Sequence, residues 1–205
     1  TPVGDGTQVS LNFTTPYETV YEGTNVDLVI VPSVTGTAGS NTINTGAGVD
    51  SIDGGTGNEN INAGAGNDTI DMAGNTTALD TIDGGDGTDT LITSAAIASS
   101  TILGGVSNVE ILSVEGDGIA VSLAADVGPA IFYLTDAGGQ TLTLSTGYTQ
   151  ATSVYLTGDV TNTDTVTNSA ADVDLKVYGN AADFDSGTTI TGGSNTDELI
   201  ISQGG

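Results

Sequence analysis

Cysteine and histidine are both absent from this chain of 205 residues. The absence of cysteine excludes disulfide bonds and thiol chemistry. The absence of histidine excludes a Ser-His-Asp triad, a Cys-His dyad and a His-Glu-x-x-His zinc site. We therefore expect the chain not to be an enzyme, and we assign no catalytic residue.

Positive charge is almost absent as well. Lys176 is the only basic residue, against 26 acidic ones, so the formal net charge is −25. A chain this acidic is not expected to bind nucleic acid or an anionic membrane surface. Lys176 lies in a strand-like run, where a solvent-facing position is favoured over a catalytic role. The composition instead predicts a fold that needs cations to relieve its own electrostatic repulsion.

Long apolar runs are also missing. No stretch of 18 apolar residues occurs, so we expect no membrane-spanning segment. The first residues, TPVGDG, contain neither a basic region nor an apolar run, so they do not predict a cleavable signal peptide. The last residues, ISQGG, show no clear secretion signal, and we expect the chain to be part of a longer protein.

Glycine and aspartate are abundant and recur with a period of nine between Gly36 and Ile92. Written in nines, the sequence reads GTAGSNTIN, TGAGVDSID, GGTGNENIN and AGAGNDTID, then a longer unit MAGNTTALDTID, then GGDGTDTLI. An aliphatic residue recurs in phase at Ile43, Ile52, Ile61, Ile70, Ile82 and Leu91. A flexible glycine-rich linker would not keep this phase, so the pattern indicates a folded repeat.

This pattern resembles the nonapeptide of RTX proteins, G-G-x-G-x-D-x-U-x. The resemblance implies that each nonamer is half a coil of a parallel β-roll, with its aliphatic residue inside. Turns two repeats apart would then stack and share calcium ions. Glycine permits turn conformations that are closed to residues with a Cβ atom, and ligands that are all oxygen favour calcium over zinc or copper. We therefore expect several bound Ca²⁺ ions.

The stacking divides the candidate ligands into two sides. The first side carries the sixth-position residues Asp50, Asp68 and Asp89, with Gly46, Gly48, Gly64, Gly66, Gly85 and Gly87 before them. The second side carries Asn41, Glu59 and Asp80, and we expect the three-residue insertion around 75–78 to distort it. We expect good sites on the first side and weaker ones on the second. For Asp53, Asp71 and Asp83, in the ninth position, two roles are open: supplementing a site or facing solvent.

The flanking segments are expected to be β-rich. We interpret residues 1–35 as an N-terminal cap or linker, with Phe13, Tyr17 and Tyr21 covering the open edge of the roll over 36–92. Residues 93–205 keep a longer period of about 22 residues, which predicts a β-solenoid. A β-sandwich is the structural alternative for part of this segment. Residues 189–202 repeat residues 81–94, so Asp197 matches Asp89 and is a further candidate ligand.

Two series of apolar residues define the longer period. One series comprises Ile111, Tyr133, Tyr155, Tyr178 and Ile200, and the other comprises Leu123, Leu144, Val166 and Ile190. The three tyrosines either stack between coils, which we favour, or bind carbohydrate. Thr143, Thr165 and Thr189 recur at similar spacing; an ice-binding face is much less favoured than ordinary strand threonines.

The composition and the link from the nonamers into the phrase NVEILSVEG resemble bacterial RTX-type S-layer proteins and large secreted adhesins. That resemblance implies type I secretion, folding outside the cell on contact with calcium, and self-association into a surface lattice or fibre, with surface polysaccharide as a candidate partner. Two alternatives stay open: an adhesin stalk, and the C-terminal RTX module of a secreted enzyme.

Overall fold

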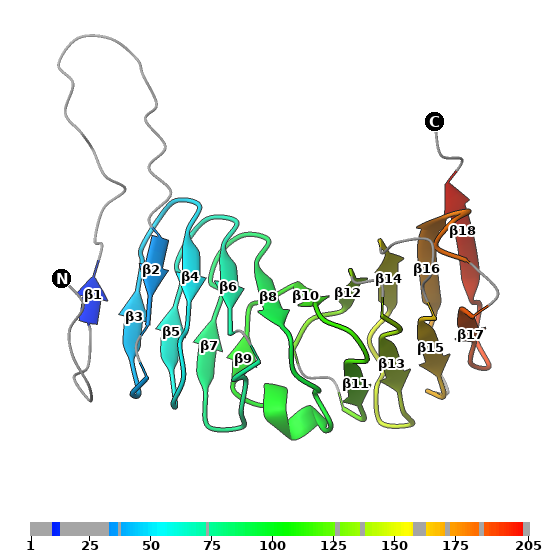
Figure 1. Cartoon of the computed structure of the whole chain (residues 1–205), viewed down its shortest axis with the longest axis horizontal. Coiled ribbons are helices and arrows are strands. Elements are labelled where there is room, and N and C mark those ends of the chain that lie inside the picture. The colour runs from blue at the N-terminus through cyan, green and yellow to red at the C-terminus, as the bar shows by residue number, and fades with distance from the viewer. Residues whose placement is uncertain are drawn as a thin grey trace, which may run out of the picture.

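The computed structural model describes residues 10–12, 33–36, 38–72, 74–125, 128–135, 138–157, 163–170, 173–184 and 187–202. Every strand pair among these residues is parallel, and the strands stack coil upon coil along one axis (Figure 1). The fold is therefore a parallel β-solenoid, which confirms the predicted class. A β-sandwich in the second half is wrong, because the same parallel ladder runs through both halves.

One nine-stranded sheet follows the whole length of the molecule. Its strands, in chain order, are β2 (Ser33–Thr35), β4 (Ser51–Asp53), β6 (Thr69–Asp71), β8 (Thr90–Thr93), β10 (Ile111–Val114), β12 (Ile131–Leu134), β14 (Thr152–Leu156), β16 (Leu175–Asn180) and β18 (Glu198–Ser202).

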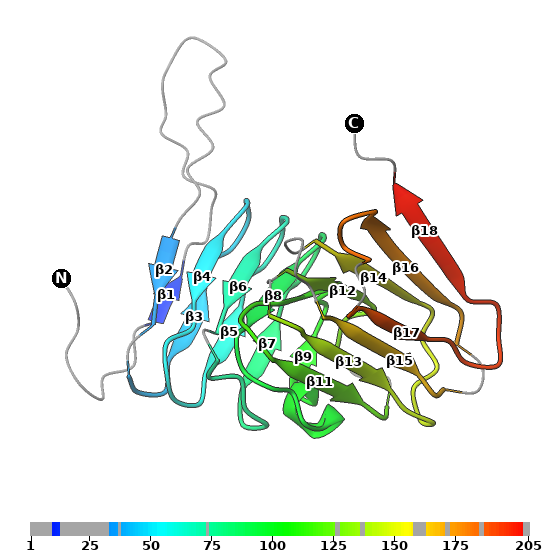
Figure 2. The same cartoon turned by 45° about the vertical axis from the view of Figure 1, so that its right-hand side comes forward.

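Two shorter sheets follow one another along the opposite face (Figures 1 and 2). The first contains β1 (Ser10–Asn12), β3 (Thr42–Asn44), β5 (Asn60–Asn62), β7 (Thr81–Asp83) and β9 (Val106–Ser107). The second contains β11 (Ala120–Leu123), β13 (Thr141–Leu144), β15 (Thr165–Asn168) and β17 (Thr189–Thr191).

The core lies between the two layers and is built by alternation along each short strand. Side chains of a strand point to opposite faces, so the central residue of a three-residue strand turns inward. Ile43, Ile52, Ile61 and Ile70 occupy this position and are at most 1 % exposed. The phased aliphatic residues of the nonamers therefore form one continuous ladder, as the period of nine predicts.

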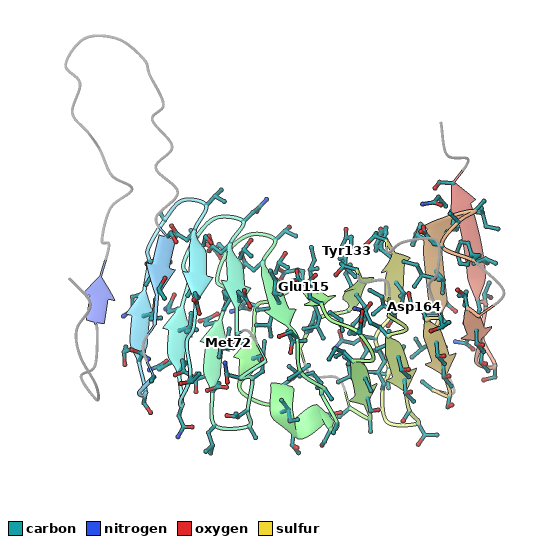
Figure 3. The ribbon with its side chains drawn as sticks, viewed as in Figure 1. Met72, Glu115, Tyr133 and Asp164 are labelled. Atoms are coloured by element: carbon teal, nitrogen blue, oxygen red, sulfur yellow. The ribbon has the colours of Figure 1, made fainter. Side chains whose placement is uncertain are left out.

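The insertion around residues 75–78 leaves the strand register intact. Ile61 on β5 pairs with Ile82 on β7, as it would without the extra residues. Met72 (labelled in Figure 3) is fully buried, whereas Leu79 is 70 % exposed. The extra residues thus bulge outward at the turn, and the expected distortion is confined to that turn.

Between β8 and β10 the five-stranded sheet ends and the four-stranded sheet begins. Ile97 forms a bridge to Val121 and so begins the four-stranded ladder, while β9, further along the chain, closes the five-stranded one. Between them lies the 3-10 helix η1 (Ser100–Leu103), the one helix in the described part of the chain. No helix in that part is long and apolar enough to cross a membrane.

The register of the second half corrects our alignment of the longer period. Tyr133 pairs with Ser113, not with Ile111. The reason is that the coils have unequal lengths: the register shifts by 20 residues from β10 to β12 and by 22 or 23 from each later coil to the next. A constant period therefore misplaces a residue by two, which keeps its side of the sheet but changes its neighbour.

The four-stranded sheet shows the same shift. Leu144 pairs with Asn168 rather than with Val166. The threonines consequently form two columns, Thr141–Thr165–Thr189 and Thr143–Thr167–Thr191, instead of the one that we expected.

The N-terminal cap cannot be placed from the described residues. Phe13, Tyr17 and Tyr21 lie outside them, as does most of the segment 1–35. Within that segment, β1 pairs with β3 and β2 pairs with β4, so both the five-stranded and the nine-stranded sheet extend into it.

Candidate metal sites

The glycine turns of the first side have the conformation that the nonamer requires. The six glycines have φ angles between 98° and 147°, a region that residues with a Cβ atom rarely adopt. The turns are also stacked tightly, because a Cβ atom on Gly64 would lie 1.7 Å from the carbonyl oxygen of Gly46. The same distance separates a Cβ atom on Gly85 from the carbonyl oxygen of Gly64. Only glycine fits here, and backbone carbonyls of successive coils are brought together.

The first-side carboxylates form a hydrogen-bonded column at the start of the nine-stranded sheet. Asp50, Asp68 and Asp89 each lie just before a strand and are at most 1 % exposed. The N–H of Asp50 donates to Oδ1 of Asp68 (2.8 Å), and the N–H of Asp68 donates to Oδ1 of Asp89 (2.8 Å). The carboxylates of Asp68 and Asp89 thus each accept a backbone N–H of the coil before them.

The same column holds carboxylate oxygens without a hydrogen-bond partner among the described residues. These are both oxygens of Asp50 and the Oδ2 atoms of Asp68 and Asp89. Burial raises the pKa of all three groups, and that of Asp68 rises to about 6, with the charges of Asp50 and Asp89 contributing. A buried anion without a partner is strongly destabilising, so these carboxyl groups are stable in the fold when they are protonated or when a cation compensates their charge.

The second side is less regular. Asn41, Glu59 and Asp80 are all buried, and neither carboxylate oxygen of Glu59 has a hydrogen-bond partner in the described structure. Burial, together with the charge of Asp80, raises the pKa of Glu59 to about 7. Both oxygens of Asp80 accept N–H groups, from Glu59 (2.8 Å) and Thr77 (2.7 Å). Asp80 therefore organises the turn of the insertion, and Glu59 is the acid of this side that lacks compensation.

The ninth-position aspartates lie at strand ends, outside the two columns. Asp53, Asp71 and Asp83 end strands β4, β6 and β7 on the outward face. Oδ1 of Asp53 accepts the N–H of Gly55 (3.0 Å), and Oδ1 of Asp83 accepts the side-chain N–H of Asn108 (2.7 Å). Asp83 is nevertheless near enough to the first-side column for its charge to raise the pKa of Asp89.

Asp197 repeats the first-side arrangement at the other end of the molecule. Its Oδ1 accepts the N–H of Leu175 (3.2 Å), one coil earlier. A Cβ atom on Gly192 would lie 2.1 Å from its Oδ2, as one on Gly84 would lie 2.6 Å from Oδ2 of Asp89. Asp197 is exposed, however, because no described coil covers it.

Sequence reasoning missed two acids with the same backbone role. Oε2 of Glu110 accepts the N–H of Asp89 (2.8 Å), and Oδ1 of Asp164 (labelled in Figure 3) accepts the N–H of Gln140 (2.8 Å). Both could have been found from the sequence. Glu110 follows Asp89 by 21 residues, as Asp89 follows Asp68, and Asp164-Thr165-Val166 matches the Asp-Thr-Ile of the nonamers.

The donor set fits calcium. It consists of carboxylate oxygens and glycine carbonyls, which are hard ligands, with no nitrogen or sulfur. Among the described residues, no three side chains of acidic residues, histidine or cysteine form a metal cluster. The carbonyls crowded around the glycines offer further oxygen ligands beside the carboxylates.

The three tyrosines form a stack on the nine-stranded sheet. The ring centroids of Tyr133 and Tyr155 are 4.8 Å apart and those of Tyr155 and Tyr178 are 4.6 Å apart, with interplanar angles of 12° and 9°. Both faces of the Tyr155 ring are therefore occupied by other rings. This geometry favours cross-coil stacking over carbohydrate binding on the ring faces.

The comparison with protein families identifies the first half. The model of the RTX calcium-binding nonapeptide repeat matches residues 35–70 and 78–95, with 4 copies, about a quarter of the chain. The chain therefore contains RTX calcium-binding repeats, and the stacked glycine turns are their structural counterpart. No curated protein and no solved structure gives a match.

Proposed function

We propose that this RTX-repeat chain is a calcium-dependent structural protein of the bacterial cell surface, which folds and self-assembles into a lattice or fibre after type I secretion. RTX repeats are typical of secreted calcium-binding proteins, and the repeat roll is a structural module. The observation that carries the proposal is the column of buried, uncompensated carboxylates. Such a column is incompatible with a stable fold where calcium is scarce and compatible with one outside the cell.

The ions would be held mainly on the first side, by Asp50, Asp68 and Asp89 with the carbonyls of the glycine turns. Glu59, with Asn41 and Asp80 around it, would hold weaker ions on the second side, and Asp197 would complete a site only when another coil covers it. We propose the roll over 36–92 as the main calcium-dependent unit and the solenoid over 93–205 as its continuation. When bound, calcium would supply the charge that compensates the buried carboxylates.

The expected binding free energy of calcium is large enough to control whether the roll folds. Extracellular calcium modules bind with dissociation constants of about 10⁻⁴–10⁻³ M. At roughly ten times the dissociation constant, each ion adds about 1.4 kcal/mol to stability. Four to six ions then contribute roughly 6–8 kcal/mol, which is comparable with the whole stability of a small domain.

Exposed apolar residues on β18, the last described strand, support association with a further β-structure. Leu199 and Ile201 occupy inward positions of β18 yet are 53 % and 49 % exposed. At the opposite end, the inward residue of β2, Val34, is only 4 % exposed. An apolar strand edge of this kind is a surface on which another β-structure can add.

Electron microscopy and light scattering of the purified chain, with calcium and then with chelator, would test the proposal. Ordered sheets or filaments that form only with calcium are the expected result. A folded protein that stays monomeric at every calcium concentration would overturn self-assembly. A circular dichroism spectrum that is identical in chelator and in calcium would overturn the calcium-dependent folding.

A second candidate function is adhesion, and one cavity favours it. A hollow of about 380 Å³ lies beside the tyrosine stack, lined by Tyr155, Tyr178, Asn180, Asp183 and Ser202 among others. Oδ2 of Asp183 accepts the N–H of Asn180 (2.7 Å), while Oδ1 is buried without a hydrogen-bond partner in the described structure. A carboxylate oxygen beside apolar and amide groups suits the hydroxyl groups of a neutral sugar.

Glycan-array binding of the wild-type chain and of Asp183→Asn would test adhesion. Binding that the substitution abolishes would favour an adhesin, and the matched control Asp174→Asn, on the exposed approach to β16, should leave such binding unchanged. No glycan binding at millimolar concentrations would rule out this function for the cavity.

A further inference from the structure

We propose that the chain carries one more cation site than its nonamers define, formed by Asp89, Glu110 and the backbone carbonyl of Asn108. The site would take a hard divalent cation such as Ca²⁺. Asn108 and Glu110 lie outside the residues that match the repeat, whereas Asp89 lies within them, and the turn between β9 and β10 has neither the glycine pair nor the aspartate of the motif. The inference rests on the proposed calcium binding of the roll and extends it by one coil.

The register places Glu110 in the carboxylate column. Ile111 on β10 pairs with Thr90 on β8, so the residue before each strand, Glu110 or Asp89, occupies the same position in successive coils. Oε2 of Glu110 accepts the N–H of Asp89 at 2.8 Å, the distance at which Asp89 accepts the N–H of Asp68. Glu110 therefore continues a column whose earlier members are the proposed ligands.

The turn before Glu110 contains a residue with positive φ, as the glycine turns do, but that residue is not glycine. Asn108 has a φ angle of 49° and is the one non-glycine residue with positive φ in the described part of the chain. It lies two residues before Glu110, as Gly87 lies two residues before Asp89. Asparagine tolerates the left-handed region better than most residues. Its side-chain amide donates to Oδ1 of Asp83 (2.7 Å), which holds the turn in place.

The unpartnered Oδ2 of Asp89 and the carbonyl oxygen of Asn108 both lie close to Gly84. A Cβ atom on Gly84 would lie 2.0 Å from the carbonyl oxygen of Asn108 and 2.6 Å from Oδ2 of Asp89. Asp89 is fully buried, and this Oδ2 has no hydrogen-bond partner among the described residues. Two oxygens from successive coils thus face the same small space, with the carboxylate of Glu110 in the adjoining column position.

The charges around this point support a cation. Burial raises the pKa of Asp89, and the negative charges of Glu110 and Asp83 raise it further. The column ends here, because the next residues in the same register are Ala130 and Thr152, which have no carboxylate. Glu110 would therefore be the last ligand, at the point where the RTX roll joins the second half of the solenoid.

The test counts calcium ions bound by the full chain and by Glu110→Gln, by native mass spectrometry and calorimetric titration with calcium chloride. Glutamine keeps an oxygen that accepts the N–H of Asp89 but lacks the charge. We expect one ion fewer, with the remaining sites unchanged. The matched control is Glu115→Gln, which removes an exposed acid at the other end of β10 (Glu115 is labelled in Figure 3) and should leave the count unchanged.

An equal number of ions and equal affinities in wild type and Glu110→Gln would overturn this site and leave the proposed function standing. A wild-type chain that binds no calcium would instead overturn the proposed function itself. If Glu110→Gln fails to fold in calcium, the bound ions are counted instead on Asn108→Val, with Asn108→Gly as its control. Valine disfavours positive φ and should remove one ion, glycine should keep it, and equal counts in both would overturn the site.

Discussion

The two halves of this molecule build the same coil in different ways. In the roll, strands β2 to β7 have three residues and bury one inward side chain each, such as Ile52 on β4. From β10 onwards, all strands but β17 have four or more residues and most bury at least two, such as Leu142 and Leu144 on β13. Because apolar burial is the main source of stability, the second half can hold together by packing alone.

The turns of the two halves also differ, in the residues that precede the strands. The roll places Asp50, Asp68 and Asp89 before the strands of the nine-stranded sheet, where the second half has Ala130 and Thr152. In the second half a buried amide bonds to the backbone instead: Nε2 of Gln140 donates to the carbonyls of Val114 (2.7 Å) and Gly116 (3.3 Å). We therefore expect the roll to depend more on cations and the second half more on side-chain packing, although both follow the same backbone path.

Removal of calcium should produce the largest difference in stability between the two halves. We expect a chelator to withdraw roughly 6–8 kcal/mol from the roll, if four to six ions are bound, and little from the second half. Hydrogen exchange followed by mass spectrometry should show loss of protection over 38–93 and retained protection over 131–156. Equal loss of protection in both segments would show that the halves form a single cooperative unit.

The next largest effect is expected from Gly85→Ala. The new Cβ atom would lie 1.7 Å from a backbone oxygen of the neighbouring coil, at a φ of 98°. We expect a loss of more than about 3 kcal/mol from the roll in saturating calcium, measured by urea denaturation. The control is Gly118→Ala in the second half, where φ is 69° and no atom lies within 4 Å of the added Cβ. This control should cost only about 1–2 kcal/mol, and equal costs would contradict the proposed crowding of the roll turns.

The pH dependence should also differ between the halves. In chelator, stability of the roll should rise as the pH falls from about 8 to about 5, because folding raises the pKa of Asp68 to about 6 and that of Glu59 to about 7. The sign follows from proton uptake: between the unfolded and folded pKa values, the folded state binds more protons, so acidification favours it. With calcium the sign should reverse, since protons compete with the ion.

Thermal unfolding of the roll at several pH values, with Asp68→Asn as a comparison, would measure this effect. The substitution should reduce the pH dependence in chelator, whereas Asp53→Asn, on the exposed face of β4, should not. Stability that falls on acidification in chelator would contradict the assignment.

The smallest effect is expected from Tyr155→Ala in the second half. It removes two ring contacts, each worth about 0.5–1.5 kcal/mol, and the loss should be the same with and without calcium. Tyr155→Phe keeps the stacked rings and should cost less than about 0.5 kcal/mol. A loss that depends on calcium would show that the tyrosine stack is coupled to the ion sites.

The sequence was sufficient for the roll because each nonamer repeats all its constraints. Glycine, acid and aliphatic residue recur at fixed distances, so strands, turns and the inward face follow directly. The second half repeats only the alternation of inward residues, while its turns vary in length, so the period predicted the solenoid but misplaced Tyr133 relative to Ser113 by two residues.

The candidate site shows the same limit. The first-side acids and glycines could be found from the motif, and the structure places all of them at stacked turns. The role of Asp80 as an acceptor for the insertion could not be predicted, since it depends on the path of an irregular loop. Glu110 was missed because the turn directly before it lacks glycine, and the strand register reveals that it continues the column.

The carboxylate column also gives the chain a direction of assembly. Each acid satisfies the backbone of the coil that precedes it: Glu110 serves Asp89, Asp89 serves Asp68, and Asp68 serves Asp50. A coil of the roll is therefore complete only after its C-terminal neighbour is in place. The packed second half can serve as the template. Folding is then expected to spread from it towards the N-terminus, one coil at a time.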